Sequence, residues 1–482
     1  MNSGAVRRVL GELLVLEAIL LLLPLLVALY AQQGDAPAFL VTICLTAAAG
    51  VALILASPPR TLQIGVREGL TIVTLGWILL SLLGALPFVL SGSTTTYVDA
   101  FFETVSGFTT TGATLIGNPE GLPSGILFWR SFTHWVGGMG ILVFTLALVP
   151  ALGVGGFQLF KAESPGPVAD KIAPRLRDTA RILYLTYIGM TLLQIILLTL
   201  GGMSLFDSIL HTFGTVGTGG FSTRSSSIGA YTSTYIHWVI TIFMLLSGVN
   251  FSLYFALYRG RWRDVLRNEE LRLYLGVVVV SALLIGMNIL SDYRHQGLAL
   301  RDSFFQVSSI ITTTGYATAD FDLWPAFSKL ILLFLMLMGA SAGSTAGGIK
   351  QVRFVVLFKL IKREIAKTFH PRGYIPIKLN GKSLSSDTVS GITSFLALYA
   401  LIFVVGVLLI SLEGIDLESA ISSVACTLSN IGPGFGVVGP TRTFSEFGAA
   451  SKLVFAALML LGRLELFTVV AWITPQAWRH RS

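Results

Sequence analysis

Ten mostly apolar stretches lie along this chain of 482 residues. A helix of about 20 apolar residues is long enough to cross the hydrocarbon core of a bilayer. The ten predicted spans lie at about 9–30, 37–57, 70–91, 124–150, 181–201, 232–258, 272–291, 326–360 (interrupted), 388–411 and 450–476. The pattern therefore predicts an all-α membrane protein with ten transmembrane helices.

Four shorter apolar segments lie between the last eight spans, and each leads into a loop rich in threonine and glycine. The segments cover about 99–109, 207–214, 302–311 and 418–427. They are too short to cross a membrane and are typical of re-entrant segments. Non-helical backbone at membrane depth is tolerated where protein or a water-filled cavity surrounds it. We therefore expect the four loops to face a lumen.

The four loops are versions of one another, and each centres on a glycine. Their central residues are Thr110, Thr111 and Gly112; Thr218, Gly219 and Gly220; Thr313, Thr314 and Gly315; and Asn430, Ile431 and Gly432. The residue 13 positions before each glycine is Asp99, Asp207, Asp302 or Ser419. Aspartate and serine are preferred helix N-caps, so we expect these four residues to cap the short helices.

A unit repeated four times can surround an axis with four similar walls. Extended Thr/Gly backbone around an axis supplies a ring of carbonyl oxygens that replaces the hydration shell of a cation. Glycine suits this role because it reaches positive φ without steric cost, and four helix C-termini aimed at one cavity favour a cation. The alternative is a set of polar surface loops between helices. Four copies with matched spacing favour a cation pore built from one chain.

The repeats divide the chain into five predicted domains. Residues 1–60 form an N-terminal transmembrane hairpin. Residues 61–165, 166–265, 266–375 and 376–482 form pore repeats 1 to 4, each with the order helix, pore loop, helix.

The composition excludes an ordinary soluble protein. Hydrophobic residues make up 53% of the chain and charged residues 12%, against about 25% charged in soluble proteins. Most of the 33 lysines and arginines lie in tails and loops on one predicted side. The positive-inside rule places that side, with both termini, in the cytoplasm, which explains the basic charge without a nucleic-acid partner. The six histidines and two cysteines show no metal-ligand spacing.

The eighth span is interrupted by small and polar residues at 339–348. Its candidate gating residues are Gly339, Gly343, Ser344, Thr345, Gly347, Gly348 and the adjoining Lys350. Successive glycines make a poor helix, since each costs about 1 kcal/mol relative to alanine. Small residues at this spacing also promote close helix packing, so a tight packing seam is the alternative. We favour a flexible loop that crosses the pore beneath the filter.

Arg463 lies at the middle of the last predicted span. A charge at the bilayer centre is expensive and marks a functional site by default. We expect Arg463 to face the pore, where it repels cations or bonds the carbonyls of the small-residue loop. The alternatives are a pair with an acid such as Glu465, or a side chain that extends to the inner interface.

These motifs carry a family resemblance. The four Thr/Gly loops, the segment Gly339–Lys350 and the run Gly462–Thr468 resemble the Trk/Ktr/HKT superfamily of potassium transporters. The TrkH/TrkG branch is most similar, because it has an extra N-terminal helix pair. The resemblance implies four helix–pore-loop–helix repeats around one central pore, a homodimer, and regulation by a cytoplasmic ring of TrkA-like nucleotide-binding subunits. It also assigns the small-residue loop to gating. Gly112, where sodium-permeable plant members carry serine, favours potassium.

The sequence thus predicts potassium uptake across a bacterial inner membrane through a channel-like pore. K⁺ is the transported ion, and no other cofactor is expected. The alternatives in the same class are a proton- or sodium-coupled potassium symporter and a sodium-permeable member. A membrane-embedded enzyme is the alternative of a different class, and it would need a catalytic cluster that the sequence does not offer. Membrane lipid is the remaining expected partner.

Overall fold

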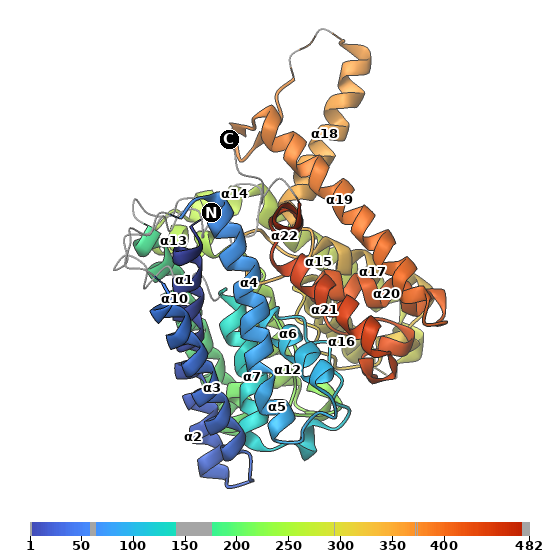
Figure 1. The fold of residues 1–482 in the computed structure, drawn as a ribbon. Helices are drawn as coiled ribbons and strands as arrows, with labels where there is room; N and C mark the ends of the chain where they lie inside the picture. The colour runs from blue at the N-terminus through green and yellow to red at the C-terminus, as the bar shows by residue number, and fades with distance from the viewer. Residues whose placement is uncertain are drawn as a thin grey trace.

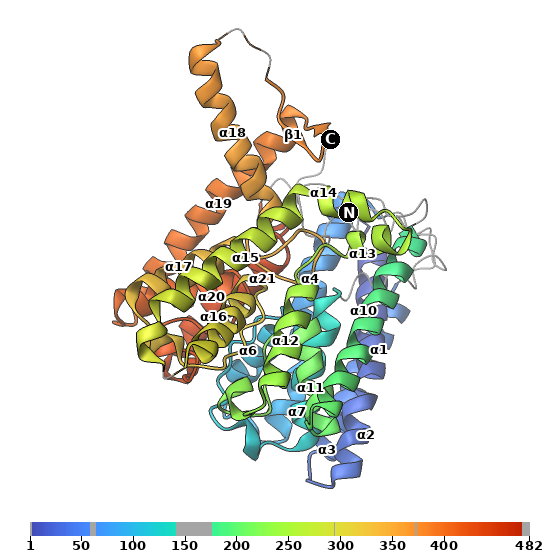
Figure 2. The ribbon, with the colours of Figure 1, turned by 180° about the vertical axis from the view of Figure 1, so that it is seen from behind.

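The computed structural model describes residues 2–57, 64–140, 176–293, 295–371, 373 and 375–474. These residues are mostly helical, and the strands among them are β1 (Lys378–Leu379) and β2 (Lys382–Ser383), which pair antiparallel. The helices form a broad body, and α18 (Gln351–Phe369) projects from one side of it together with the start of α19 (Ser386–Ser411) (Figures 1 and 2).

The N-terminal helices α1 (Ser3–Leu20), α2 (Leu22–Ala31) and α3 (Ala36–Leu55) form a hairpin beside the rest of the body (Figure 1). Helices α1 and α3 cross closely at two glycines. A Cβ atom on Gly50 would lie 2.8 Å from the carbonyl oxygen of Gly11. Small residues permit this approach, which is a common basis of helix pairing in membranes.

The remaining helices fall into four groups of similar order, each with a short helix between two others. The groups are α4 (Val66–Gly84), α5 (Leu86–Leu90), α6 (Tyr97–Phe108) and α7 (Ser124–Gly138); α10 (Leu176–Leu200), α11 (Leu205–Val216) and α12 (Thr234–Ser247); α15 (Glu269–Asn288), α16 (Gln296–Ile311) and α17 (Ala326–Met338); and α19, α20 (Leu417–Leu428) and α21 (Ala449–Arg463). The connecting helices are α13 (Phe251–Tyr258), α14 (Trp262–Arg267) and α22 (Leu466–Ile473).

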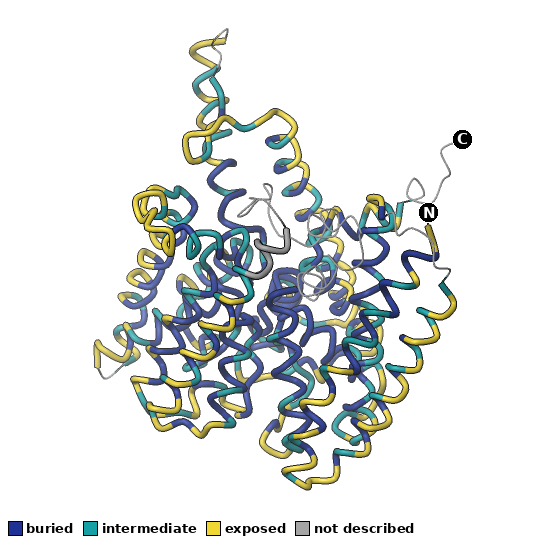
Figure 3. The backbone as a smooth tube through the Cα atoms, turned by 90° about the vertical axis from the view of Figure 1, so that its left-hand side faces the viewer, coloured by how far each residue is buried: buried dark blue, intermediate teal, exposed yellow. Residues whose placement is uncertain are grey.

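Packing between the groups follows one rule. The helix after each short helix packs against the short helix of the next group: α7 on α11, α12 on α16, α17 on α20, and α21 back on α6. The contacts therefore close into a cycle. Burial is greatest in the middle of the body (Figure 3), whereas the outer faces carry exposed leucines such as Leu45, Leu192 and Leu408, as expected of surfaces that face lipid.

Length and hydropathy alone account for only some of the ten predicted spans among the described residues. Among the described residues six helices are long and apolar enough, or eight if each of two bent pairs counts as one span. The bends are 92° between α12 and α13 and 115° between α21 and α22. Asn250 caps α13 by accepting from Ser252 N–H, and Glu465 has a φ of 59°, so neither helix continues. The predicted span 124–150 extends beyond the described residues.

The eighth predicted span consists of two helices, and the predicted interruption lies between them. Helix α17 ends at Met338 after 13 residues, and α18 begins at Gln351. Four residues between them adopt positive φ: Gly339, Gly343, Gly348 and Lys350. The segment between the helices is therefore a loop inside the body.

The close crossing of α1 and α3 should contribute to the thermal stability of the protein. We expect Gly50→Leu to lower the melting temperature of the detergent-solubilised protein, because overpacking a tight contact costs about 1–3 kcal/mol. Gly276→Leu on α15 is the matched control, since a Cβ there would meet nothing within 4 Å. Equal losses in the two variants, measured by thermal unfolding, would contradict the close crossing.

Candidate functional site

The short helices α6, α11, α16 and α20 end in the same unusual backbone conformation. The second residue after each helix has a left-handed φ: 54° at Thr110, 55° at Thr218, 56° at Thr313 and 58° at Asn430. Each of these N–H groups bonds the carbonyl three residues earlier, and the next N–H bonds the carbonyl five residues earlier. This is the Schellman motif, which usually has glycine at the left-handed position.

Threonine in this conformation is strained. β-branched residues rarely adopt positive φ, and each such residue costs on the order of 1–3 kcal/mol. The surrounding structure must therefore hold Thr110, Thr218 and Thr313 in place. All three are fully buried, and strain of this kind is typical of functional sites.

The four loops touch one another in a closed ring. A Cβ atom on Gly112 would lie 1.9 Å from the carbonyl oxygen of Gly219. The same relation joins Gly220 to Thr314 (1.9 Å), Gly315 to Ile431 (2.0 Å) and Gly432 to Thr111 (2.7 Å). In every case the carbonyl belongs to the residue just before the next loop's glycine. No side chain fits at these glycines, and all four have positive φ, between 79° and 94°.

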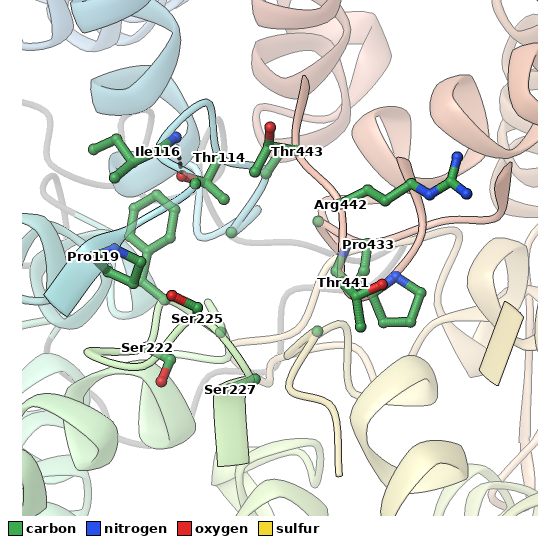
Figure 4. A pocket seen from close by; sticks show the side chains of 18 of the residues that line it. Thr114, Ile116, Pro119, Ser222, Ser225, Ser227, Pro433, Thr441, Arg442 and Thr443 are labelled. Carbon is green, nitrogen blue, oxygen red and sulfur yellow. Dashed lines mark hydrogen bonds between the residues drawn. The ribbon is translucent and has the colours of Figure 1, made fainter. Parts of the chain in front are cut away.

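The four glycines line one opening. They border a cavity of about 120 Å³ together with residues that follow the loops, among them Thr114, Ser222 and Thr441. Figure 4 shows these side chains around the opening on segments from different parts of the chain. Among the described residues no group of three or more His, Cys, Asp or Glu side chains could hold a metal ion. The polar groups of the ring itself are the backbone carbonyls named above and the hydroxyls of its threonines.

The predicted N-caps are wrong. The capping side chains are Thr96, Ser204 and Asp416, which accept from the N–H groups of Asp99, Asp207 and Ser419 three residues later. Asp302 lies inside α16, because that helix begins at Gln296 and its preceding residue, His295, makes no capping bond. Threonine, serine and aspartate are all good caps, so residue type alone did not decide which position starts the helix.

Three of these four residues instead brace the chain after each loop. Asp207 accepts from Thr223 Oγ1 at 2.7 Å, and Asp302 accepts from Thr318 Oγ1 at 3.2 Å. Both threonines lie three residues after the glycine of their loop. Ser419 Oγ accepts from the N–H of Val437 at 3.0 Å.

In the first group Asp99 does not bond the chain after the loop. Glu103 makes that contact instead. Asp99 pairs with Lys452 of α21 at 2.7 Å. Glu103, nine residues before Gly112, accepts from Thr114 Oγ1 (2.8 Å), Leu115 N–H (3.0 Å) and Arg130 Nε (2.7 Å).

Sequence reasoning missed the roles of Glu103 and Lys452, although a signal was present. Polar residues also lie nine positions before the next two glycines, at His211 and Gln306, and His211 Nε2 lies 2.9 Å from Ser222 Oγ.

The small-residue segment lies directly against the loops, on the side where the short helices end. Gly347 N–H donates to Thr313 Oγ1 at 2.7 Å. Thr345 Oγ1 donates to the carbonyl of Val216, the last residue of α11, at 3.1 Å. A Cβ on Gly347 would lie 2.3 Å from the carbonyl of Ser429 at the end of α20. The segment therefore contacts three of the four groups.

Other predicted gating residues hold the segment in shape. Gln351 Nε2 donates to the Gly339 carbonyl at 2.8 Å, and Ser344 Oγ donates to the Ser341 carbonyl at 2.6 Å. Gly343 packs against Asn250, Gly348 packs against Gly339, and Lys350 Nζ donates to the Ala346 carbonyl. Glu270, which sequence reasoning did not single out, accepts from Ala342 N–H at 2.7 Å.

Arg463 does not lie in the middle of a continuous span, because α21 ends at this residue and the chain bends. Its guanidinium donates to the Thr345 carbonyl at 2.8 Å and to the carbonyls of Gly137 and Gly138. Arg463 thus connects the small-residue segment to the end of α7. Glu465 pairs with Arg353.

Comparisons with known proteins agree with one another. The family model described as TrkH, cation transport protein, matches residues 35–290 and 271–478. The Trk system potassium uptake protein TrkH of Escherichia coli strain K12 is 40% identical over all of both chains. TrkG of the same strain is 37% identical over 99% of this chain and all of that protein.

A solved structure is similar over nearly the whole chain. The crystal structure of the potassium transporter TrkH from Vibrio parahaemolyticus matches with a TM-score of 0.89 and 36% identity, over 99% of this chain and 100% of that chain. The apolar helices and this match make the protein a multi-pass membrane protein. The chain belongs to the TrkH family of cation transport proteins.

Proposed function

We propose that the protein takes up potassium through a channel-like pore, and that the four loops form its selectivity filter. The observation that carries this proposal is the closed ring of glycine-to-carbonyl contacts. A ring of backbone carbonyls replaces the water around a cation. The relatives named as potassium uptake proteins support potassium as the ion.

Four helix C-termini add to the cation preference of this ring. Helices α6, α11, α16 and α20 each end at a loop, and a helix C-terminus carries roughly half a negative charge. In this proposal the four groups are the four pore repeats with the domain boundaries given above, and the membrane contains ten spans. The glycine side of the ring faces outward, and the small-residue segment, the basic loops and both termini face the cytoplasm.

The membrane potential is sufficient to drive uptake. It supplies about 2.3 kcal/mol per charge for each 100 mV. The acid beside the first loop, Glu103, is committed to Arg130 and to donors of its own loop. This commitment favours passive flow over a proton-coupled mechanism.

The segment 339–348 is the proposed gate, and Arg463 is its latch. The segment lies against the inner side of the loops, and Arg463 bonds the Thr345 carbonyl. A guanidinium there both anchors the segment and repels the permeating ion. Displacement of the segment would open the conduit.

Helix α18, which projects from the body, has an exposed apolar face that suggests contact with other chains. Its exposed apolar residues Phe358, Ile361, Ile365 and Phe369 recur at helical spacing. We propose that the protein is a homodimer in the bacterial inner membrane and that a TrkA-like nucleotide-binding ring docks on its cytoplasmic side. Apolar surface outside a lipid-facing body is expected to be covered by a partner.

The proposed filter should determine which ion the protein prefers. Purified protein in liposomes should take up ⁸⁶Rb⁺ under an imposed inside-negative potential, with little competition from Na⁺. We expect Gly315→Ser to reduce the K⁺/Na⁺ preference about tenfold, equivalent to ~1.4 kcal/mol, because a Cβ there displaces the Ile431 carbonyl. Gly297→Ala, where a Cβ meets nothing within 4 Å, is the control. The proposal fails if the wild-type protein carries no Rb⁺, or if Gly315→Ser keeps the original preference.

The proposed latch should limit the rate of uptake. Arg463→Ala should raise the initial rate of ⁸⁶Rb⁺ uptake. Like charges within a nanometre repel by on the order of 2 kcal/mol at an effective dielectric of about 20, which corresponds to roughly 30-fold in rate. Arg463→Lys, which keeps the charge but has all its donors on one nitrogen rather than on the spread guanidinium, should lie between the two. An unchanged or lower rate in correctly folded Arg463→Ala would contradict a barrier role.

A further inference from the structure

A buried ion pair lies beside the first loop, and its arginine, Arg130, borders the cavity that the four glycines line. Arg130 Nε donates to Glu103 Oε1 at 2.7 Å, and the two side chains are 4% and 0% exposed. The carboxylate also accepts from Thr114 Oγ1 and from the N–H of Leu115. Glu103 therefore fixes the chain where it leaves the first loop, two and three residues after Gly112.

The guanidinium extends from this acid to the second loop. Arg130 Nη1 donates to the carbonyl of Ser222 at 3.0 Å, and Nη2 donates to Thr114 Oγ1 at 3.0 Å. Its plane lies over the ring of Phe221, 3.7 Å from the centroid. Thr114 and Ser222 occupy equivalent places, each two residues after the glycine of its loop. The Arg130 side chain thus connects two neighbouring loops at equivalent positions.

A second contact from the same helix reinforces this junction. His134, one turn after Arg130 on α7, has Nδ1 2.8 Å from the carbonyl of Gly107, and its Nε2 accepts from Phe221 N–H at 3.2 Å. A carbonyl requires a donor and an N–H requires an acceptor, so the ring is neutral with its proton on Nδ1. A Cβ on Gly219 would lie 2.2 Å from this imidazole. Helix α7 therefore spaces the first and second loops with two side chains.

The carbonyl ring depends on that spacing. Gly112 abuts the carbonyl of Gly219 across the same junction, so movement of either loop changes the spacing of the carbonyl oxygens in the ring. A smaller ion such as Na⁺ needs the oxygens to close in further than K⁺ does. A ring whose loops are fixed in place resists this contraction, whereas a loosened ring accommodates both ions.

We propose that Glu103 and Arg130 are positioning residues that set the preference for K⁺ over Na⁺ by fixing the first filter loop to the second. The inference rests on the proposed potassium-conducting function. Arg130 borders the cavity beside the glycines, but the proposed effect does not require either side chain to touch the ion. Their effect is transmitted through Thr114 and Ser222 to the carbonyls beside Gly112 and Gly220.

The experiment compares ⁸⁶Rb⁺ and ²²Na⁺ uptake into liposomes by the full-length protein and three variants. Glu103→Gln keeps the shape but leaves the buried guanidinium without its counter-charge. Arg130→Lys keeps the charge but places its three donors on one nitrogen, so it lacks the planar fork that reaches Glu103, Thr114 and Ser222 from separate nitrogens. Both should lower the Rb⁺/Na⁺ uptake ratio about tenfold or more. Thr114→Val removes only the shared hydroxyl and should lower the ratio roughly threefold.

The Rb⁺/Na⁺ uptake ratio separates a positioning role from a purely structural one. A loss of folded protein reduces Rb⁺ and Na⁺ uptake equally and leaves their ratio unchanged. The control is the Glu269–Lys359 pair, which joins α15 to α18 away from the loops. Glu269→Gln should keep the wild-type ratio. If Glu103→Gln and Arg130→Lys do not elute as intact protein in size-exclusion chromatography, Thr114→Val decides the question.

Two results have distinct meanings. A wild-type protein that carries no Rb⁺ overturns the proposed function itself. A selective wild-type protein whose folded variants keep its Rb⁺/Na⁺ ratio overturns the positioning role and leaves the proposed function intact.

Discussion

Everything in this fold depends on the contact between the glycine of one loop and a carbonyl of the next. Each contact is possible only because the glycine has no side chain, and the four contacts close on themselves. The helices repeat the same cycle outside, where α7, α12, α17 and α21 each pack on a neighbouring short helix. No loop can therefore shift alone, since its glycine and its carbonyl belong to two different contacts. The strained threonines persist because this arrangement leaves them no room to relax.

The four groups keep one backbone but support it with different side chains. Asp207 and Asp302 bond a threonine beyond their loops, whereas Ser419 bonds a backbone N–H. In the first group the ion pair of Glu103 and Arg130 supports the loop. Asp99, the residue expected there, is bound to Lys452 on α21 instead. Backbone geometry is constrained by the ring, while the supporting chemistry is free to vary as long as it reaches the same place. Because the supporting side chains differ, a substitution can alter the support of one loop without changing the supporting residues of the others.

Much of this organisation could be predicted from local signals. The family resemblance is confirmed, and the short apolar segments correspond to α6, α11, α16 and α20, because segment length and the spacing of glycines are visible in the sequence. Features that depend on tertiary contact were not predictable. Thr96 rather than Asp99 caps α6. Both residue types suit a cap, so the sequence could not distinguish the two positions. The break after Arg463 follows from a positive φ at Glu465, which has no sequence signature. The Glu103–Arg130 pair joins residues 27 positions apart and becomes apparent only when α6 packs on α7.

The hydrogen bond from Gly347 to Thr313 has a thermodynamic consequence. While the small-residue segment stays in place, a hydroxyl oxygen of the third loop is occupied by a backbone donor. In the proposed gating step, withdrawal of the segment frees that lone pair for a dehydrated ion at the innermost position. Occupancy of that position and withdrawal of the segment then favour each other, by reciprocity of linked equilibria. In the proposed pore, supply of the ion therefore favours the open state, and depletion of the ion favours the closed one.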